Sequence, residues 1–117
     1  MIQAIHHFAI IVSSEKSVEF YTKFGFNQIF RKERTYDTVV LMEGYGIQIE
    51  LFIDSNHPPR AVNPENIGLR HLALKVDNIE NTIKELGLSD IEINTDWLGK
   101  RYGYIFDPDS LPVELHE

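Results

Sequence analysis

The chain has 117 residues, of which 43% are apolar and 25% are charged, so it is long and apolar enough for one globular domain with a core. Its net charge of −7 argues against general electrostatic binding of nucleic acid or anionic lipid. The absence of cysteine excludes disulfides, thiolate metal sites and cysteine nucleophiles. No apolar run approaches the roughly 20 residues that span a membrane, and the N-terminus lacks a secretory signal, so we expect a cytoplasmic protein.

The first half of the chain predicts one strand, one helix and three further strands. Residues 4–12 (AIHHFAIIV) form a short apolar run rich in β-branched residues, which is typical of a strand. Ser14 is placed to cap a helix over residues 15–24, which Gly25 then ends. Turn residues divide the remainder into predicted strands over residues 26–33, 37–43 and 46–53.

The second half repeats this order after a polar loop over residues 54–68. Residues 69–76 predict a strand, Asp77 a helix cap, and residues 78–86 a short helix. Three more strands are predicted near residues 91–95, 101–106 and 111–116. The element order is therefore β-α-β-β-β, written twice.

An internal repeat supports this division. The segment HFAIIV at 7–12 matches HLALKV at 71–76, and IQIELF at 47–52 matches LPVELH at 111–116, both at an offset of 64 residues. Two copies of this length indicate one pseudo-twofold α+β domain over residues 1–117 and not a solenoid. Module one covers about residues 1–53 and module two about residues 69–117, and a central site is expected on the axis between them.

The repeat places two histidines and two glutamates at matching positions. His7 aligns with His71, and Glu50 aligns with Glu114. Because strand residues alternate between faces, each histidine shares a face with a small alanine two residues later, and each glutamate lies opposite an apolar face. If the sheet curls, all four side chains can face one cavity.

These four residues predict a metal site. Two buried carboxylates without a counter-charge are costly, and a divalent cation supplies that charge. Two imidazoles and two carboxylates suit Ni, Co, Zn, Mn or Fe in octahedral geometry, with two positions left for water or substrate. A substrate with two adjacent oxygens would displace both waters, and the metal would act as a Lewis acid.

The chain resembles the vicinal oxygen chelate superfamily, which includes glyoxalase I, fosfomycin-resistance proteins, extradiol dioxygenases and bleomycin-resistance proteins. The matching segments are HHFAIIV…FYTKFGF, IQIELF, GLRHLALKVDNIE and FDPDSLPVEL, and the second half is most similar to small bacterial proteins labelled lactoylglutathione-lyase-like. The resemblance implies two βαβββ modules that curl into a barrel-like mixed sheet around one divalent metal ion. It places the ligands on His7, Glu50, His71 and Glu114, and it makes a homodimer plausible.

By this resemblance, the expected function is that of a glyoxalase-like lyase or isomerase. It would act by proton transfer on a small 2-oxo or 2-hydroxy compound or its thiol adduct, with Glu114 as the base and Glu50 as the second candidate. The loop around 96–100 differs from that of glyoxalase I, which argues against glutathione. The turn at 107–110 ends in Ser110 where glycine is common, so either a residue with positive φ is strained there or the turn type differs.

Three basic residues are candidates for binding a substrate anion. Lys100 and Arg101 precede the strand that ends near Asp107, and Arg60 lies in the central loop. Other functions remain open: a fosfomycin-type thiol transferase, an epimerase, an extradiol dioxygenase and a metal-free binding protein. The presence of four ligands counts against the thiol transferase, the dioxygenase and the metal-free protein. Nucleic acid and membranes are not expected partners.

Overall fold

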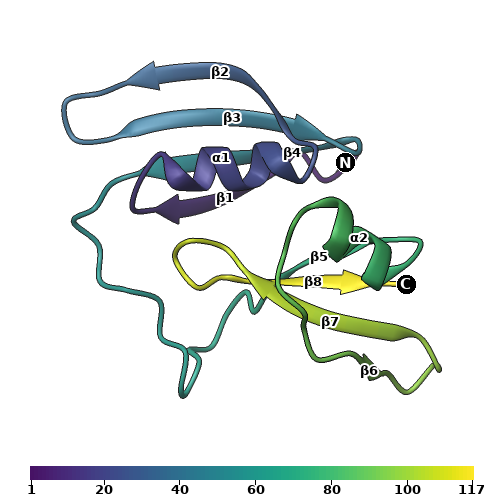
Figure 1. Cartoon of the computed structure of the whole chain (residues 1–117). Coiled ribbons are helices and arrows are strands. Elements are labelled where there is room, and N and C mark those ends of the chain that lie inside the picture. Colours follow the sequence, from purple (N-terminus) through teal and green to yellow (C-terminus); the bar gives the residue numbers. More distant parts are fainter. The chain divides into compact units, whose positions relative to one another are not determined.

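The structure is a computed structural model that describes residues 1–117, and the chain divides into two compact units, Met1–Pro58 and Pro59–Glu117. Unit 1 contains, in chain order, β1 (His7–Val12), α1 (Lys16–Lys23), β2 (Asn27–Glu33), β3 (Thr38–Gly44) and β4 (Ile47–Ile53) (Figure 1). Unit 2 contains β5 (Leu72–Lys75), α2 (Ile79–Glu85), β6 (Asn94–Thr95), β7 (Arg101–Phe106) and β8 (Pro112–His116). The predicted α+β class and the two βαβββ modules are confirmed.

Each unit has one four-stranded mixed sheet with the same topology. The order is β1-β4-β3-β2 in unit 1 and β5-β8-β7-β6 in unit 2. In each sheet the first strand pairs in parallel with the last, and the other pairings are antiparallel. The last strand of each module is therefore a central strand, and it places its side chains between those of two neighbours.

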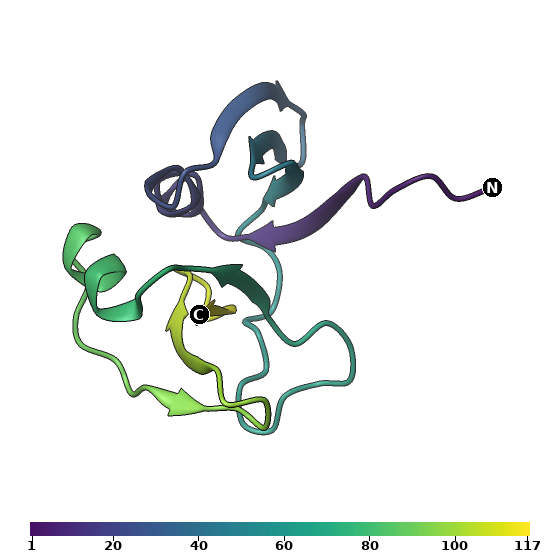
Figure 2. The same ribbon diagram turned by 90° about the vertical axis from the view of Figure 1, so that its right-hand side faces the viewer.

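The core of unit 1 lies on the sheet face that α1 covers. Met42 and Ile49 are a registered pair on β3 and β4, and both are fully buried. Tyr21 and Phe24 bring the apolar side of α1 into the same core, and Figure 2 shows the helix close to end-on beside the curved sheet. The opposite face of this sheet remains free to carry polar side chains.

The core of unit 2 is built in the same way. Val113 and Leu115 of β8 are fully buried, together with Ile79 of α2. Gly103 of β7 permits the chain to approach closely, since an added Cβ would lie 2.7 Å from the Ile91 side chain and 2.8 Å from the Glu92 carbonyl oxygen. The strand predicted near 91–95 is limited to the two residues of β6, which pair with Arg101 and Tyr102.

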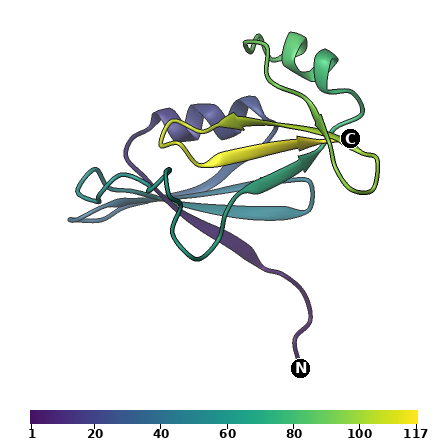
Figure 3. The same ribbon diagram turned by 90° about the horizontal axis from the view of Figure 1, so that it is seen from below.

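Two predicted strands are shorter than expected, for different reasons. β1 begins at His7 instead of residue 4, because its partner β4 begins at Ile47 and a longer β1 would have no strand beside it. The first six residues are exposed and run away from the sheet (Figure 2, Figure 3). β5 begins at Leu72 instead of 69, and the Arg60 guanidinium donates hydrogen bonds to the carbonyls of Leu69 and Arg70 just before it.

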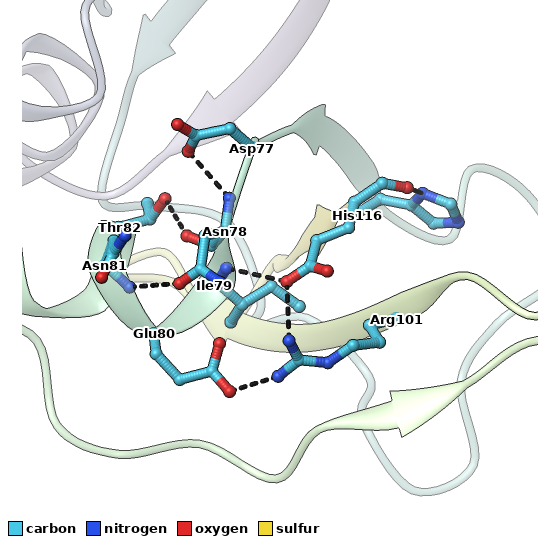
Figure 4. A network of polar contacts seen from close by, with 9 residues as sticks. Asp77, Asn78, Ile79, Glu80, Asn81, Thr82, Arg101 and His116 are labelled. Carbon is cyan, nitrogen blue, oxygen red and sulfur yellow. Dashed lines mark hydrogen bonds and ion pairs between the residues drawn. The ribbon is translucent and has the colours of Figure 1, made fainter.

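One predicted helix cap is confirmed in part and the other is wrong by one residue. At the start of α1, the Ser14 hydroxyl accepts a hydrogen bond from the Lys16 N–H at 3.3 Å, although the N-cap position falls on Glu15, whose carboxylate accepts two hydrogen bonds from Arg31 at 2.7 Å. In α2, the Asn78 side chain accepts a hydrogen bond from the Asn81 N–H at 2.9 Å, while Asp77 accepts one from the Asn78 N–H (Figure 4). Neither helix is long and apolar enough to cross a membrane.

Candidate metal centre and its surroundings

Each unit brings one predicted histidine ligand to one predicted glutamate ligand. In unit 1, His7 Nε2 lies 3.7 Å from Glu50 Oε2. In unit 2, His71 Nε2 lies 2.8 Å from Glu114 Oε2. The four residues that were predicted as ligands thus form two His–Glu pairs, one on each sheet.

The pairs occupy equivalent register positions. Ala9 is registered with Glu50 across β1 and β4, and Ala73 is registered with Glu114 across β5 and β8. The alternation of exposure along β1 puts His7, Ala9 and Ile11 on the more exposed face, which confirms the predicted facing of that strand. In both units a methyl group is therefore the neighbour of the carboxylate.

The two pairs differ in burial. The Glu114 side chain is 11% exposed, against 23% for that of Glu50. His71 Nδ1 is buried and has no hydrogen-bond partner, and the His71 ring packs edge-on against Tyr104 with centroids 5.4 Å apart. The pair in unit 2 is thus better shielded from water than the pair in unit 1.

Tyr104 is a site residue that the sequence analysis missed. It is registered directly opposite Glu114 across β7 and β8, so both side chains emerge on the same face. Burial is the main cause that raises the pKa of the Tyr104 phenol, and the charge of Glu114 and a hydrogen bond to it act in the same direction. The phenol therefore keeps its proton near neutral pH and can donate it in a hydrogen bond to the carboxylate. The sequence contained the information needed to find Tyr104, because the turn at 107–110 sets the register of the hairpin and hence which β7 residue faces Glu114.

A second histidine lies on the same face of β8 as Glu114. His116 Nε2 is 3.0 Å from Asp96 Oδ2 and 3.9 Å from Glu114 Oε1. Asp96 also accepts hydrogen bonds from the backbone N–H groups of Leu98 and Lys100, both at 2.9 Å. The Lys100 N–H is the main cause that lowers the Asp96 pKa, and the interaction with His116 contributes. Asp96 thus connects the 96–100 turn to the strand that carries Glu114.

The three predicted anion-binding residues have different surroundings. The Arg101 guanidinium contacts Glu80 and lies 3.2 Å from Glu117 Oε2, and Glu117 in turn accepts a hydrogen bond from the Ile79 N–H at the start of α2 (Figure 4). Lys100 is exposed in the turn before β7. Arg60 lines a pocket that also includes His71. Arg60 is therefore the one of the three that lies beside a predicted metal ligand.

The donor geometry of each pair fits a metal ion. Two ligand atoms that are each about 2.1 Å from one ion, at right angles, are separated by about 3 Å. The observed nitrogen-to-oxygen separations of 3.7 Å and 2.8 Å lie near that value. No group of three or more His, Asp or Glu side chains suited to a metal occurs in the structure.

Comparisons with known proteins decide the family. Residues 4–115 match the model of the glyoxalase/bleomycin resistance protein/dioxygenase superfamily. The chain belongs to this superfamily. It is 44% identical to the uncharacterized protein YwkD of Bacillus subtilis over 100% of this chain and 98% of that protein. It is 35% identical to a glyoxalase family protein from Enterococcus faecalis, with a TM-score of 0.88 and 98% of both chains covered.

More distant members of the superfamily share the fold. A lactoylglutathione lyase from Agrobacterium tumefaciens is 22% identical, with a TM-score of 0.69 and coverage of 100% of this chain and 95% of that chain. The fosfomycin resistance protein FosX from Listeria monocytogenes, in a complex with Mn(II) and sulfate, is 20% identical, with a TM-score of 0.70 and coverage of 99% and 93%. These likenesses show the fold alone, and which reaction this chain performs depends on its own residues.

Proposed function

We propose that this chain is a divalent-metal-dependent, glyoxalase-like lyase or isomerase that acts by proton transfer on a small 2-oxo or 2-hydroxy compound or its thiol adduct. The observation that carries the proposal is the pair of matched His–Glu contacts at equivalent register positions of the two sheets. A metal-free binding protein would have no use for such matched pairs. The family's Mn(II)-bound FosX structure supports a divalent ion in this fold.

The residues that would hold the ion are His7, Glu50, His71 and Glu114. Nitrogen and oxygen donors of this kind suit Ni, Co, Zn, Mn or Fe. When bound, the ion supplies Lewis-acid stabilisation of negative charge on the substrate oxygens. A homodimer belongs to the proposal, because members of this superfamily can assemble a site from two chains.

Glu114 is the proposed base. Its side chain is more buried than that of Glu50, and the phenol of Tyr104 lies opposite it on the neighbouring strand. A carboxylate that removes a proton from carbon needs a fixed position and protection from bulk water. The Tyr104 phenol is placed to donate a hydrogen bond that would fix Glu114, whereas Leu41 takes the equivalent place opposite Glu50.

The ligand assignment is tested by metal stoichiometry. The apo-protein is reconstituted separately with Ni, Co, Zn and Mn, and bound metal is measured by elemental analysis. We expect one equivalent per site in the wild type and a clear loss in the Glu50→Gln, Glu114→Gln double variant. Glu43→Gln is the matched control, because Glu43 is an exposed glutamate on β3. A full equivalent of metal in the double variant would refute the ligand set.

The reaction class is tested with the same reconstituted samples. Methylglyoxal is offered with several thiols, and product formation is followed for each metal. We expect turnover with at least one thiol, and a Glu114→Gln variant that loses far more activity than Glu50→Gln. Metal binding without turnover for any thiol would contradict the glyoxalase assignment but not the proposed metal site.

A further inference from the structure

A small pocket opens in unit 2 next to His71. It encloses about 220 Å³, which is below the roughly 300–1,000 Å³ of sites for drug-sized ligands, so it suits a small molecule or one end of a larger one. All of its lining residues belong to unit 2: Arg60, Val62, Glu65, Arg70, His71, Tyr104, Phe106, Ser110 and Pro112.

One side of the pocket carries two arginines and a single carboxylate. Glu65 Oε1 accepts a hydrogen bond from Arg70 Nε at 3.0 Å, and Glu65 Oε2 lies 3.6 Å from Arg60 Nη2. The interaction with Arg70 is the main cause that lowers the Glu65 pKa, so this carboxylate is ionised near neutral pH. The two guanidinium groups thus share Glu65 as their one direct carboxylate partner, while the charge of Glu114 acts on Arg70 from farther away.

The Arg60 guanidinium is held by hydrogen bonds, but one of its N–H donors has no partner. Its Nη2 donates to the carbonyl oxygens of Arg70 at 2.8 Å and Leu69 at 3.3 Å, which fixes the guanidinium plane. Its Nε is buried and has no hydrogen-bond partner. A buried donor left without a partner is costly, and an anion would gain this hydrogen bond only if the Arg60 side chain shifted to expose Nε.

The other side of the pocket comes from the β7–β8 hairpin. Phe106 and Pro112 are a registered pair, and Phe106 is 60% exposed, so an apolar surface faces the open part of the pocket. Ser110 adds a hydroxyl group and adopts φ of 70°, an uncommon conformation for a residue with a side chain. Of the two alternatives expected for this turn, the structure thus shows the residue with positive φ. The pocket thus combines a cationic side, an apolar side and a hydroxyl.

We infer that this pocket binds an anionic group of the substrate, a carboxylate or a phosphonate, through the guanidinium groups of Arg60 and Arg70. The inference rests on the proposed function, because it places the anion of the same substrate beside the predicted ligand His71. The planar guanidinium fork matches the two oxygens of such a group, and a bound anion takes over the place of the Glu65 carboxylate. The substrate class is then a small 2-oxo or 2-hydroxy compound that carries an acid group.

The alternative is that Arg60, Arg70 and Glu65 have only a structural role, in which their contacts stabilise the conformation of residues 59–70. Anion binding by protein without added metal separates the two roles. Lactate and methylphosphonate are titrated into nitrogen-15-labelled protein in a low-chloride buffer, with lactamide as the neutral analogue. The Nε–H signal of Arg60 and the backbone signals of residues 60–71 report on the pocket. We expect saturable shifts with lactate or methylphosphonate and none with lactamide, and the stronger of the two anions identifies the acid group.

Two substitutions make the test selective. Arg70→Gln is expected to weaken anion binding about tenfold, and Glu65→Gln is expected to strengthen it, because it removes the competing carboxylate. A purely structural cluster predicts no gain in the Glu65→Gln variant. Lys32→Gln on β2 is the charge-matched control and should leave binding unchanged.

Turnover gives a second readout if the proposed reaction is established. Arg70→Gln should raise KM for an acidic substrate with little change in kcat, and it should leave the metal stoichiometry at the wild-type value. Equal shifts with lactamide, or anion affinities that are the same in the wild type, Arg70→Gln and Glu65→Gln, would overturn the inference. Because these titrations use protein without added metal, a negative result would leave the metal stoichiometry test unaffected.

Discussion

Tyr104 lies directly opposite Glu114 across β7 and β8, on the same face of the sheet. The equivalent neighbour of Glu50 in unit 1 is Leu41. The two modules therefore repeat the predicted ligand types but give the two carboxylates different surroundings. One carboxylate faces a phenol that is placed to donate a hydrogen bond, whereas the other faces an aliphatic side chain that has no donor. This difference supports the proposal that Glu114, and not Glu50, is the base.

Tyr104→Phe should lower turnover about tenfold or more without removing the metal. The substitution keeps the ring against His71 but removes the hydroxyl of the residue that faces Glu114, and a hydrogen bond to a charged group contributes about 1.5–3 kcal/mol. The measurement is kcat and metal content of the reconstituted protein, together with the pH profile of kcat/KM.

Tyr102→Phe is the control for this substitution. Tyr102 is on the same face of β7, its ring centroid is 5.9 Å from that of Tyr104, and it is registered with His116 instead of Glu114. It should keep nearly full turnover. If both variants behaved alike, or if Tyr104→Phe left the rate and pH profile unchanged, the hydrogen bond would have no role in catalysis.

The sequence was informative wherever strand periodicity decides the outcome. The 64-residue offset placed His7 with His71 and Glu50 with Glu114, and alternation along the strands predicted which face each would take. Those predictions need only the two-residue period of a strand, and the burial of alternate residues in β4 agrees with them. In β8 the glutamate is buried as well, between the buried Val113 and Leu115.

The sequence was less informative where contacts join distant segments. Arg60 donates hydrogen bonds to the carbonyls of Leu69 and Arg70, two residues that were predicted to belong to β5 but lie before it. No local sequence pattern predicts these hydrogen bonds. Likewise, Glu15 binds Arg31, which lies 16 residues later, instead of capping its own helix. Tertiary contacts of this kind override local propensity, because a charged side chain takes the strongest partner within reach.

Asn78→Ala should destabilise unit 2. The Asn78 side chain satisfies the Asn81 N–H in the first turn of α2, and loss of such a cap costs about 1 kcal/mol. The expected fall in Tm is about 4–8 °C, measured by calorimetry or circular dichroism. Asp77→Ala should have a smaller effect, because Asp77 bonds only the N–H of Asn78, outside the helix. If Asp77→Ala lowered Tm as much as Asn78→Ala or more, Asp77 would be the residue that caps α2.

Ser110→Gly should leave stability unchanged or raise it slightly. Its φ of 70° costs an L-residue about 1–2 kcal/mol, which glycine avoids, while the more flexible unfolded chain offsets about 0.4–1 kcal/mol of the gain. Ser110→Ala keeps the backbone strain and removes only the hydroxyl, so a comparison of the two variants by urea unfolding separates the two effects. A Ser110→Gly variant clearly less stable than Ser110→Ala would show that the turn is not strained.

Asp96 should make stability fall in acid. Hydrogen bonds from the Lys100 and Leu98 N–H groups and the interaction with His116 lower its pKa in the folded state. The stabilisation is therefore present above the unfolded pKa of about 3.9 and is lost as the pH falls through the folded value. Asp96→Asn should lower the free energy of unfolding at pH 6–7, and the difference from wild type should shrink below about pH 4.

The measurement for Asp96 is urea unfolding of both proteins at a series of pH values between about 2.5 and 7. Asp90→Asn is the control, because Asp90 is an exposed aspartate in the segment between α2 and β6. It should change stability little at any pH, since it removes the same charge without removing the contacts to the 96–100 turn. A wild-type advantage over Asp96→Asn that stayed constant down to the lowest pH would mean that the carboxylate charge does not hold this turn to β8.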